Sequence, residues 1–187
     1  GNNLTKFQAS YHNATKIRDI AIITLFLTSG IRIRELVGID INDLDFNNKS
    51  FVVTRKGGNQ VILYLSDEAI PCLLDYIDVR NEQLNKKNLS DSEEPALFLS
   101  LQNKRISIRA VENLVKKYAK IAAPLKKITP HKLRSTYGTA LYRQTNDIYM
   151  VAEVLGHKDV NTTKKHYAAI SEDMRKQAAN IVKLSDK

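Results

Sequence analysis

TPHKLRSTYGTAL, residues 129–141, is the stretch from which the rest of this chain can be interpreted. Thr129 is a favourable N-cap for a helix because its hydroxyl can accept a backbone N–H, and Pro130 suits the first helical position, which needs no donor. His131 and Arg134 then share one face of the predicted helix. The pattern therefore places an imidazole and a guanidinium close together near a helix N-terminus.

Two further elements follow this helix, and they lead to a histidine and a tyrosine. Residues 148–155, IYMVAEVL, predict a short helix. Gly156 is expected to end it in the left-handed conformation that glycine adopts without strain, so that His157 lies at a fixed point just after the helix. Asn161 is expected to cap another short helix that carries Tyr167.

The remaining patterns predict more helices and one small sheet. Residues 16–29 repeat apolar side chains with helical spacing and stop at Gly30. Strands at 51–54 and 61–65 are joined by a turn that contains Gly57-Gly58, a strong hairpin signal. Further elements are expected as helices at residues 34–37, 66–85 and 108–122 and as a third short strand at residues 97–99. Mostly helix plus a small antiparallel sheet indicates an α+β fold in a single domain.

Composition favours a polyanionic partner. The chain has 187 residues, 43% of them hydrophobic, with a net charge of +9 and a pI near 9.6. Nucleic acid fits better than a membrane, since no stretch approaches the ~20 apolar residues of a spanning helix and no signal peptide opens the sequence. Cys72 alone cannot form an internal disulfide, and no Cys/His spacing typical of zinc is present. We therefore expect no metal or other cofactor and a reducing, cytoplasmic location.

Four motifs resemble the catalytic core of the tyrosine recombinase (phage integrase) family. They are Gly30-Ile31-Arg32-Ile33-Arg34-Glu35-Leu36, His131-x-x-Arg134, Leu155-Gly156-His157 and Tyr167. Any one of them would be a weak signal, but four in this order are highly specific. The resemblance implies the catalytic-domain fold of DNA breaking-rejoining enzymes over residues 15–187, after a polar lead-in at residues 1–14. The separate N-terminal core-binding domain of such proteins is expected to be absent from this chain.

Arg32 is the first predicted phosphate ligand. Its neighbours Ile31 and Ile33 are apolar, so its charge is expected at the edge of the core, where a guanidinium needs a partner. One interpretation pairs it with Glu35 in a structural ion pair. The resemblance implies instead that Arg32 and Arg134 hold the two non-bridging oxygens of one phosphate, with Glu35 as orienting support, because guanidinium forks match that geometry.

Lys56 lies in the predicted hairpin turn, where most lysines are solvated surface charges. The resemblance implies that it reaches the DNA minor groove and protonates the leaving 5′ oxygen, a contribution of roughly 10²–10⁴-fold in rate. This sequence departs from the usual Gly-Lys-Gly because Arg55 replaces the first glycine. Whether Lys56 or Arg55 is the leaving-group acid is therefore left open.

The histidines and the tyrosine also have ordinary interpretations, as local hydrogen-bonding or packing residues. The resemblance implies that His131 takes the proton of Tyr167 and that His157 donates a hydrogen bond to the phosphate, tasks that suit imidazole. A free phenol has a pKa of about 10, so Tyr167 needs proton removal and nearby cations to attack at neutral pH. A shorter spacing after Leu155-Gly156-His157 would select His166, which is not the expected nucleophile.

The implied reaction is site-specific DNA recombination, as in integrases and excisionases of phages or other mobile genetic elements. Tyr167 would form a 3′-phosphotyrosine bond and release a 5′-hydroxyl, and the reverse step would rejoin the strands without ATP or metal. One alternative is relaxation of DNA by a type IB topoisomerase, which differs in the Leu155-Gly156-His157 box. Another alternative is a DNA-binding module that keeps the fold without catalysis.

Two further features concern partners. The helix predicted for Ser171–Leu184 carries an apolar stripe of Met174, Ala178, Ile181 and Val182. It either packs on its own domain or, as the resemblance implies, on a neighbouring subunit of a homotetramer on synapsed double-stranded DNA. The basic side chains expected to face DNA phosphates, unless they are ordinary solvated charges, are Lys116, Lys117, Lys120, Lys126, Lys127 and Lys132.

Overall fold

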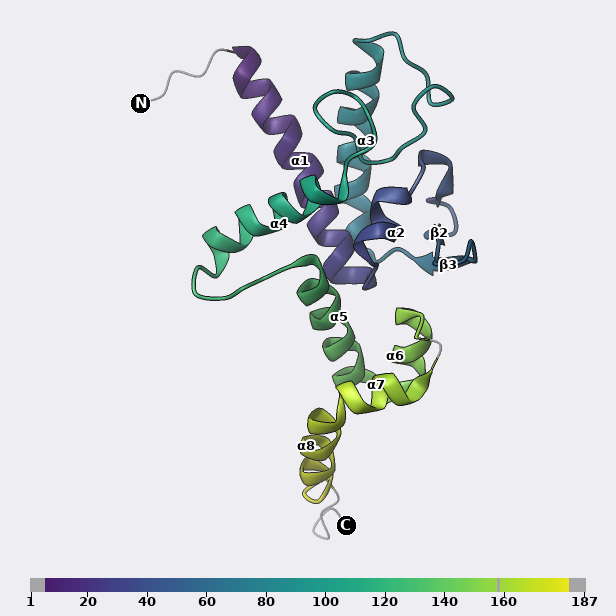
Figure 1. The fold of residues 1–187 in the computed structure, drawn as a ribbon, viewed down its shortest axis with the longest axis vertical. Coiled ribbons are helices and arrows are strands. Elements are labelled where there is room, and N and C mark those ends of the chain that lie inside the picture. The colour runs from purple at the N-terminus through teal and green to yellow at the C-terminus, as the bar shows by residue number, and fades with distance from the viewer. Residues whose placement is uncertain (1–5, 158, 182–187) are drawn as a thin grey trace, which may run out of the picture. The chain divides into compact units, whose positions relative to one another are not determined.

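The computed structural model describes residues 6–157 and 159–181 of the chain (Figure 1). The chain forms two compact units, Gly1–Arg134 and Ser135–Lys187. Helix α5 (Pro130–Thr145) contributes its first turn to the first unit and its remainder to the second. The part of the chain that is described contains no helix long and apolar enough to cross a membrane.

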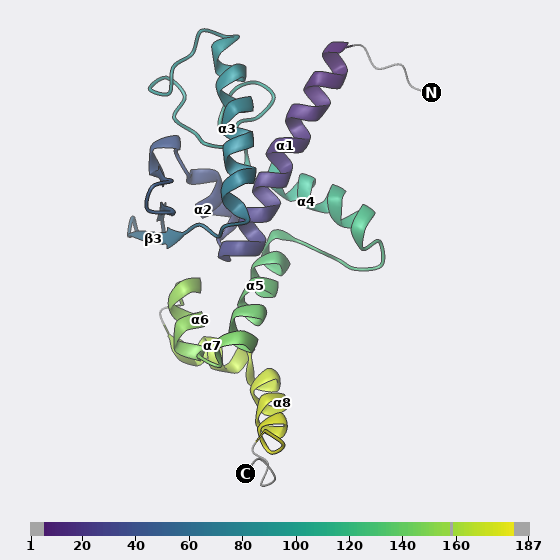
Figure 2. The same ribbon diagram turned by 180° about the vertical axis from the view of Figure 1, so that it is seen from behind.

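The first unit is mostly helical and contains one small sheet, as predicted. In chain order, its elements before α5 are α1 (Lys6–Ser29), α2 (Ile33–Gly38), the 3₁₀ turn η1 (Ile41–Asp43), β1 (Leu44–Asp45), β2 (Ser50–Thr54), β3 (Gln60–Tyr64), α3 (Ala69–Asn85) and α4 (Ile108–Ala122). Helices α1 and α3 lie side by side in both views (Figures 1 and 2). Within the predicted polar lead-in, α1 begins at Lys6 and residues 8–13 are exposed, whereas residues 1–5 lie outside the described part.

Apolar faces from several helices form the core of the first unit. On α1, Ile22, Leu25 and Phe26 are completely buried, which is the helical spacing that the sequence predicts. They pack in one cluster with Leu73 of α3 and Val111 of α4. Burial of these side chains supplies most of the driving force that holds the helices together.

The sheet has the strand order β1-β2-β3, and both strand pairs are antiparallel. The predicted hairpin is confirmed: Thr54 pairs with Gln60, and Gly57 and Gly58 adopt φ values of 89° and 83° in the turn. The predicted third strand at residues 97–99 is wrong. That segment is buried but bonds to loops, for example through the N–H of Leu97 to the carbonyl of Ile39, and β1 is the third strand.

A fully buried arginine ties a long loop to α3. Arg80 donates to the carbonyls of Ala96 and Glu94, each at 2.8 Å, and to the carboxylate of Asp91 at 2.6 Å. Its side chain is 0% exposed, whereas that of Asp91 is 54% exposed. The buried charge is therefore compensated by three acceptors from one loop, which satisfies the requirement for burying a guanidinium.

The second unit is helical and has a small core of its own. After α5 it contains α6 (Ile148–Leu155), α7 (Val160–His166) and α8 (Ala168–Ala178). Its buried cluster consists of Tyr142, Val151, Leu155 and Tyr167. Asp159, rather than the predicted Asn161, caps α7 by accepting the N–H of Asn161 at 2.9 Å.

The C-terminal helix differs from the prediction of Ser171–Leu184. It begins at Ala168 and ends at Ala178. Met174 packs against the core of the second unit, but Ile181 is 73% exposed. Val182 and the rest of residues 182–184 lie outside the described residues, so the predicted apolar stripe is described only as far as Ile181.

Candidate active site

The segment between α1 and α2 positions Arg32. Gly30 ends α1 with φ of 65°, and Ile31 is buried at 1% exposure. Arg32 then lies directly before α2 and is half-buried, whereas Arg34 is exposed. The N–H of Arg32 donates to Oε1 of Glu35 at 3.1 Å, so the Glu35 side chain satisfies one of the free donors at the start of α2.

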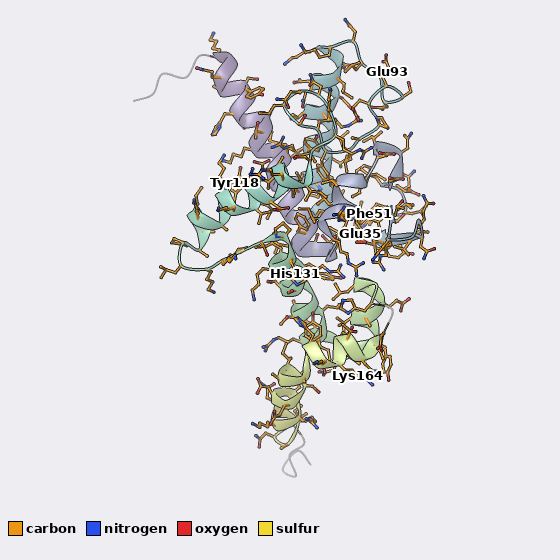
Figure 3. All side chains as sticks on the ribbon, viewed as in Figure 1. Glu35, Phe51, Glu93, Tyr118, His131 and Lys164 are labelled. Carbon is orange, nitrogen blue, oxygen red and sulfur yellow. The ribbon has the colours of Figure 1, made fainter. Side chains whose placement is uncertain are left out.

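The carboxylate of Glu35 forms an ion pair with Arg55, whereas one interpretation of the sequence pairs it with Arg32. Nε of Arg55 lies 3.4 Å from Oε2 of Glu35, and the side chains are only 13% and 3% exposed. Figure 3 labels Glu35 where α2 meets β2, the strand that leads to Arg55. Among residues 6–157 and 159–181, no ion pair of the Arg32 guanidinium occurs, so the interpretation that pairs Arg32 with Glu35 is wrong.

Arg134 comes to the same segment from the first turn of α5. Its side chain is buried, with 6% exposure, and Nη1 donates to the carbonyl of Gly30 at 2.5 Å. The predicted cap of this helix is confirmed, because the hydroxyl of Thr129 accepts the N–H of Lys132 at 3.2 Å. The Arg134 side chain thus reaches the backbone of Gly30, two positions before Arg32 in the sequence.

His131 lies one position after the first residue of α5 and is exposed (Figure 3). It lines a cavity of about 660 Å³ between α4, the segment after it and the start of α5. The basic side chains that line the same cavity are Arg109, Lys116, Lys120, Lys126 and Lys127. We call this cavity the basic groove; its charge suits an anionic polymer.

Lys56 lies at the exposed turn of the β2–β3 hairpin. The turn is closed by the N–H of Arg55 to the carbonyl of Asn59 at 2.7 Å and by the N–H of Gly58 to the carbonyl of Arg55 at 3.0 Å. Lys56 is therefore on a defined turn with its side chain in solvent, directly after the arginine that pairs with Glu35.

In the second unit, His157 is positioned by a glycine and a threonine. Gly156 adopts φ of 70°, as predicted, and the N–H of His157 donates to the carbonyl of Ala152 at 2.9 Å. Nδ1 of His157 lies 2.5 Å from the hydroxyl of Thr163, which is 0% exposed. A buried hydroxyl against Nδ1 holds the ring in one orientation.

Tyr167 lies between α7 and α8 and is 2% exposed. Its ring packs 5.6 Å from that of Tyr142 and edge-on to that of His166, 4.8 Å away. Its hydroxyl lies against Gly138, where any Cβ atom would overlap it. His166 itself is exposed.

Comparison with known proteins identifies the family. Residues 2–174 match the Phage integrase family. This chain belongs to that family.

Its relatives are named tyrosine recombinases. The chain is 41% identical over 172 residues to tyrosine recombinase XerC of Caldanaerobacter subterraneus subsp. tengcongensis, covering 91% of this chain and 46% of the relative. It is 37% identical over 180 residues to tyrosine recombinase XerS of Streptococcus agalactiae, covering 95% and 49%. The chain thus spans about half the length of the curated relatives that it matches.

Solved structures share the fold. The crystal structure of XerA recombinase matches with a TM-score of 0.71 and 27% identity over 88% of this chain and 59% of that one. XerH site-specific recombinase bound to a palindromic difH substrate matches with a TM-score of 0.72 and 22% identity over 90% and 46%. The expected recombinase catalytic-domain fold is therefore confirmed.

Three other tyrosines of this family member, Tyr76, Tyr118 and Tyr137, are buried or half-buried. Burial raises the pKa of Tyr76 to about 12, and its hydroxyl accepts the N–H of Leu99 at 2.9 Å. Burial also raises the pKa of Tyr118 and of Tyr137. The described residues contain no group of three or more His, Cys, Asp or Glu side chains that could hold a metal ion.

Two residues of the candidate site, Thr163 and Gly138, are not singled out by sequence reasoning. Arg55 is considered there only as a substitute for glycine and as an alternative acid to Lys56, not as a partner of Glu35. A glycine inside a helix costs about 1 kcal/mol relative to alanine, and that cost is the sequence signal that could have found Gly138. The partners of Arg55 and Thr163 lie on other elements, so no local pattern reveals them.

Proposed function

We propose that this chain is the catalytic part of a tyrosine site-specific DNA recombinase of the integrase type. The observation that carries the proposal is the hydrogen bond from Nη1 of Arg134 to the carbonyl of Gly30, two positions before Arg32, in the first unit. The names of the relatives, tyrosine recombinases XerC and XerS, support it. The substrate is double-stranded DNA; an origin in a phage or other mobile element remains a prediction.

In this proposal, Arg32 and Arg134 bind the scissile phosphate. The carbonyl of Gly30 orients the fork of Arg134, and Arg32 follows that glycine by two positions. The guanidinium of Arg32 has no ion-pair partner among the described residues, which leaves its charge to be compensated by an anion. As the nucleophile attacks, negative charge grows on the non-bridging oxygens, and two fixed guanidinium groups stabilise it.

Lys56 is the proposed leaving-group acid. Arg55 is half-buried and paired with Glu35, whereas Lys56 is exposed on the turn beside it. A guanidinium stays charged in proteins and gives up its proton poorly, whereas an ammonium transfers a proton readily. Both observations favour Lys56 over Arg55. Lys56 then gives a proton to the 5′ oxygen as the P–O5′ bond breaks.

Tyr167 is the proposed nucleophile, and the histidines assist it. The phenol oxygen attacks phosphorus and forms a 3′-phosphotyrosine bond while His131 accepts the phenolic proton. His157 donates a hydrogen bond to the phosphate; its ring orientation is supported by the Thr163 hydroxyl. In the second step a 5′-hydroxyl attacks the phosphotyrosine, and the same groups return the protons. The phosphodiester energy is retained in the covalent bond, so the reaction needs no ATP.

DNA binding and assembly belong to the same proposal. The basic groove beside His131 supplies five cationic side chains for phosphates. We also propose a homotetramer on synapsed DNA, joined through the C-terminal helix, and the exposed Ile181 after α8 supports this assembly. We propose the cytoplasm of a bacterial cell, at the nucleoid, as the location, where double-stranded DNA is present.

The test is covalent capture on nicked DNA. Duplexes carrying candidate recombination sites from the DNA that encodes the protein are nicked next to the scissile phosphate, so that the short 5′-hydroxyl fragment diffuses away after cleavage. The wild-type protein should form a denaturation-resistant adduct that maps to Tyr167, and Tyr167→Phe should bind the DNA without forming it. An adduct that persists in Tyr167→Phe removes the proposed nucleophile, and binding with no adduct in either protein favours a non-catalytic module.

A further inference from the structure

The Arg55–Glu35 ion pair connects two catalytic segments that lie apart in the sequence. Glu35 belongs to α2 and Arg55 to the start of the hairpin turn, and both side chains are largely buried. Each oxygen of the Glu35 carboxylate contacts a different segment: Oε1 accepts the N–H of Arg32, and Oε2 faces Nε of Arg55. A single carboxylate therefore links the segment of Arg32 to the turn that carries Lys56.

Arg55 is the residue whose side chain attaches the hairpin turn to the rest of the first unit. Among residues 55–59, which are all described, Arg55 is the one residue that is not exposed. Gly57 and Gly58 adopt positive φ values and carry no side chain with which to hold the turn. Backbone bonds close the turn on itself, but the Arg55 side chain ties it to α2.

We propose that Arg55 is a positioning residue for Lys56. Its ion pair with Glu35 fixes the base of the turn, so that the next residue delivers its ammonium group to the leaving 5′ oxygen. This inference rests on the proposed function, in which Lys56 is the acid. Arg55 itself does not touch the reacting atoms; it limits the positions that the neighbouring lysine can reach.

The test compares two leaving groups. A DNA substrate with the site that forms the covalent adduct is prepared with either oxygen or sulfur as the bridging 5′ atom at the scissile phosphate. Expulsion of an alkoxide needs an acid, whereas a thiolate leaves without one because a thiol is far more acidic than an alcohol. Cleavage rates are measured in single turnover for wild type, Arg55→Gln, Arg55→Lys and Lys56→Ala.

On the oxygen substrate, Arg55→Gln should slow cleavage by about 10- to 100-fold, as expected for misplacing an acid, and Arg55→Lys should lose less because it retains a cation for Glu35. On the sulfur substrate, both Arg55→Gln and Lys56→Ala should cleave at nearly the wild-type rate. The double variant Arg55→Gln/Lys56→Ala should be no slower than Lys56→Ala alone, because the two residues act through one group.

The outcomes separate the inference from the proposed function. The positioning role of Arg55 is wrong if Arg55→Gln cleaves slowly on both substrates. It is also wrong if Arg55→Gln cleaves the oxygen substrate at the wild-type rate while the sulfur substrate restores cleavage by Lys56→Ala. If sulfur does not rescue Lys56→Ala, the acid role of Lys56 itself fails. Lys49→Ala is the matched control, since it removes an exposed ion pair with Asp67 from the same sheet region and should leave both rates unchanged. Urea unfolding of each variant shows whether it is folded.

Discussion

The hydroxyl of Tyr167 lies so close to Gly138 that a Cβ atom at residue 138 would be only 2.1 Å from it. The same Cβ would also lie 3.1 Å from Cδ1 of Leu155. The glycine thus makes room for the proposed nucleophile on the helix that also carries Arg134.

We therefore expect Gly138→Ala to displace Tyr167. The added methyl group overpacks the site at a cost of about 1–3 kcal/mol, while alanine returns about 1 kcal/mol of helix propensity. Net stability should thus fall only slightly, but nitration of Tyr167, followed by peptide mapping, should increase, and adduct formation on nicked DNA should decrease. Gly38→Ala is the control, because nothing lies within 4 Å of a Cβ atom there. Unchanged nitration and adduct formation in Gly138→Ala would contradict the close fit.

Thr163→Val tests the hydroxyl that contacts His157. Valine keeps the shape of this buried side chain but removes its bond to Nδ1. Losing this hydrogen bond, which contributes about 1 kcal/mol to transition-state stabilisation by orienting the ring, should lower the cleavage rate roughly five- to tenfold. Single-turnover rates across pH should show the loss, and Thr162→Val, an exposed neighbour, should behave as wild type. Equal effects of the two changes would mean that the threonine does not act through His157.

Arg80→Met should destabilise the first unit strongly. The change leaves the buried carbonyl of Ala96 and the partly buried carbonyl of Glu94 without their donor, and a cost of about 3–5 kcal/mol is expected for breaking such a buried charged network. Asp91→Asn should cost much less, because that carboxylate is half in solvent. Urea unfolding midpoints measure both, and similar losses for the two variants would show that the ion pair, rather than the carbonyl bonds, carries the stability.

The basic groove predicts a salt-dependent loss of DNA binding. Lys126→Ala/Lys127→Ala should weaken binding to all DNA sequences and reduce the slope of log K against log salt by about 1 for each phosphate that the protein no longer neutralises. Lys86→Ala/Lys87→Ala carries the same change of charge and serves as the control, since these two lysines line a different cavity. An identical slope for both double variants would remove the groove as a specific DNA-binding surface.

Local signals in the sequence predicted what depends on nearby residues. The cap at Thr129, the left-handed Gly156 and the hairpin turn at Gly57-Gly58 each follow from interactions within a few positions. The third strand was misplaced for the opposite reason. Residues 97–99 are as apolar as a buried strand, but their backbone partners are loops, and the pairing of Leu44 with Phe51 is not visible in either segment alone.

By itself, the sequence determined the family, the α+β class and the identities of the residues proposed for catalysis, because these depend on motifs and on short-range hydrogen bonding. Tertiary structure decided which groups are partners. In the folded chain, the Glu35 carboxylate pairs with Arg55 rather than with the Arg32 guanidinium, and Arg134 donates to the carbonyl of Gly30. The Tyr167 hydroxyl leaves no room for a side chain at residue 138. Such choices depend on the packing of distant elements, where an ångström of displacement changes which atoms meet.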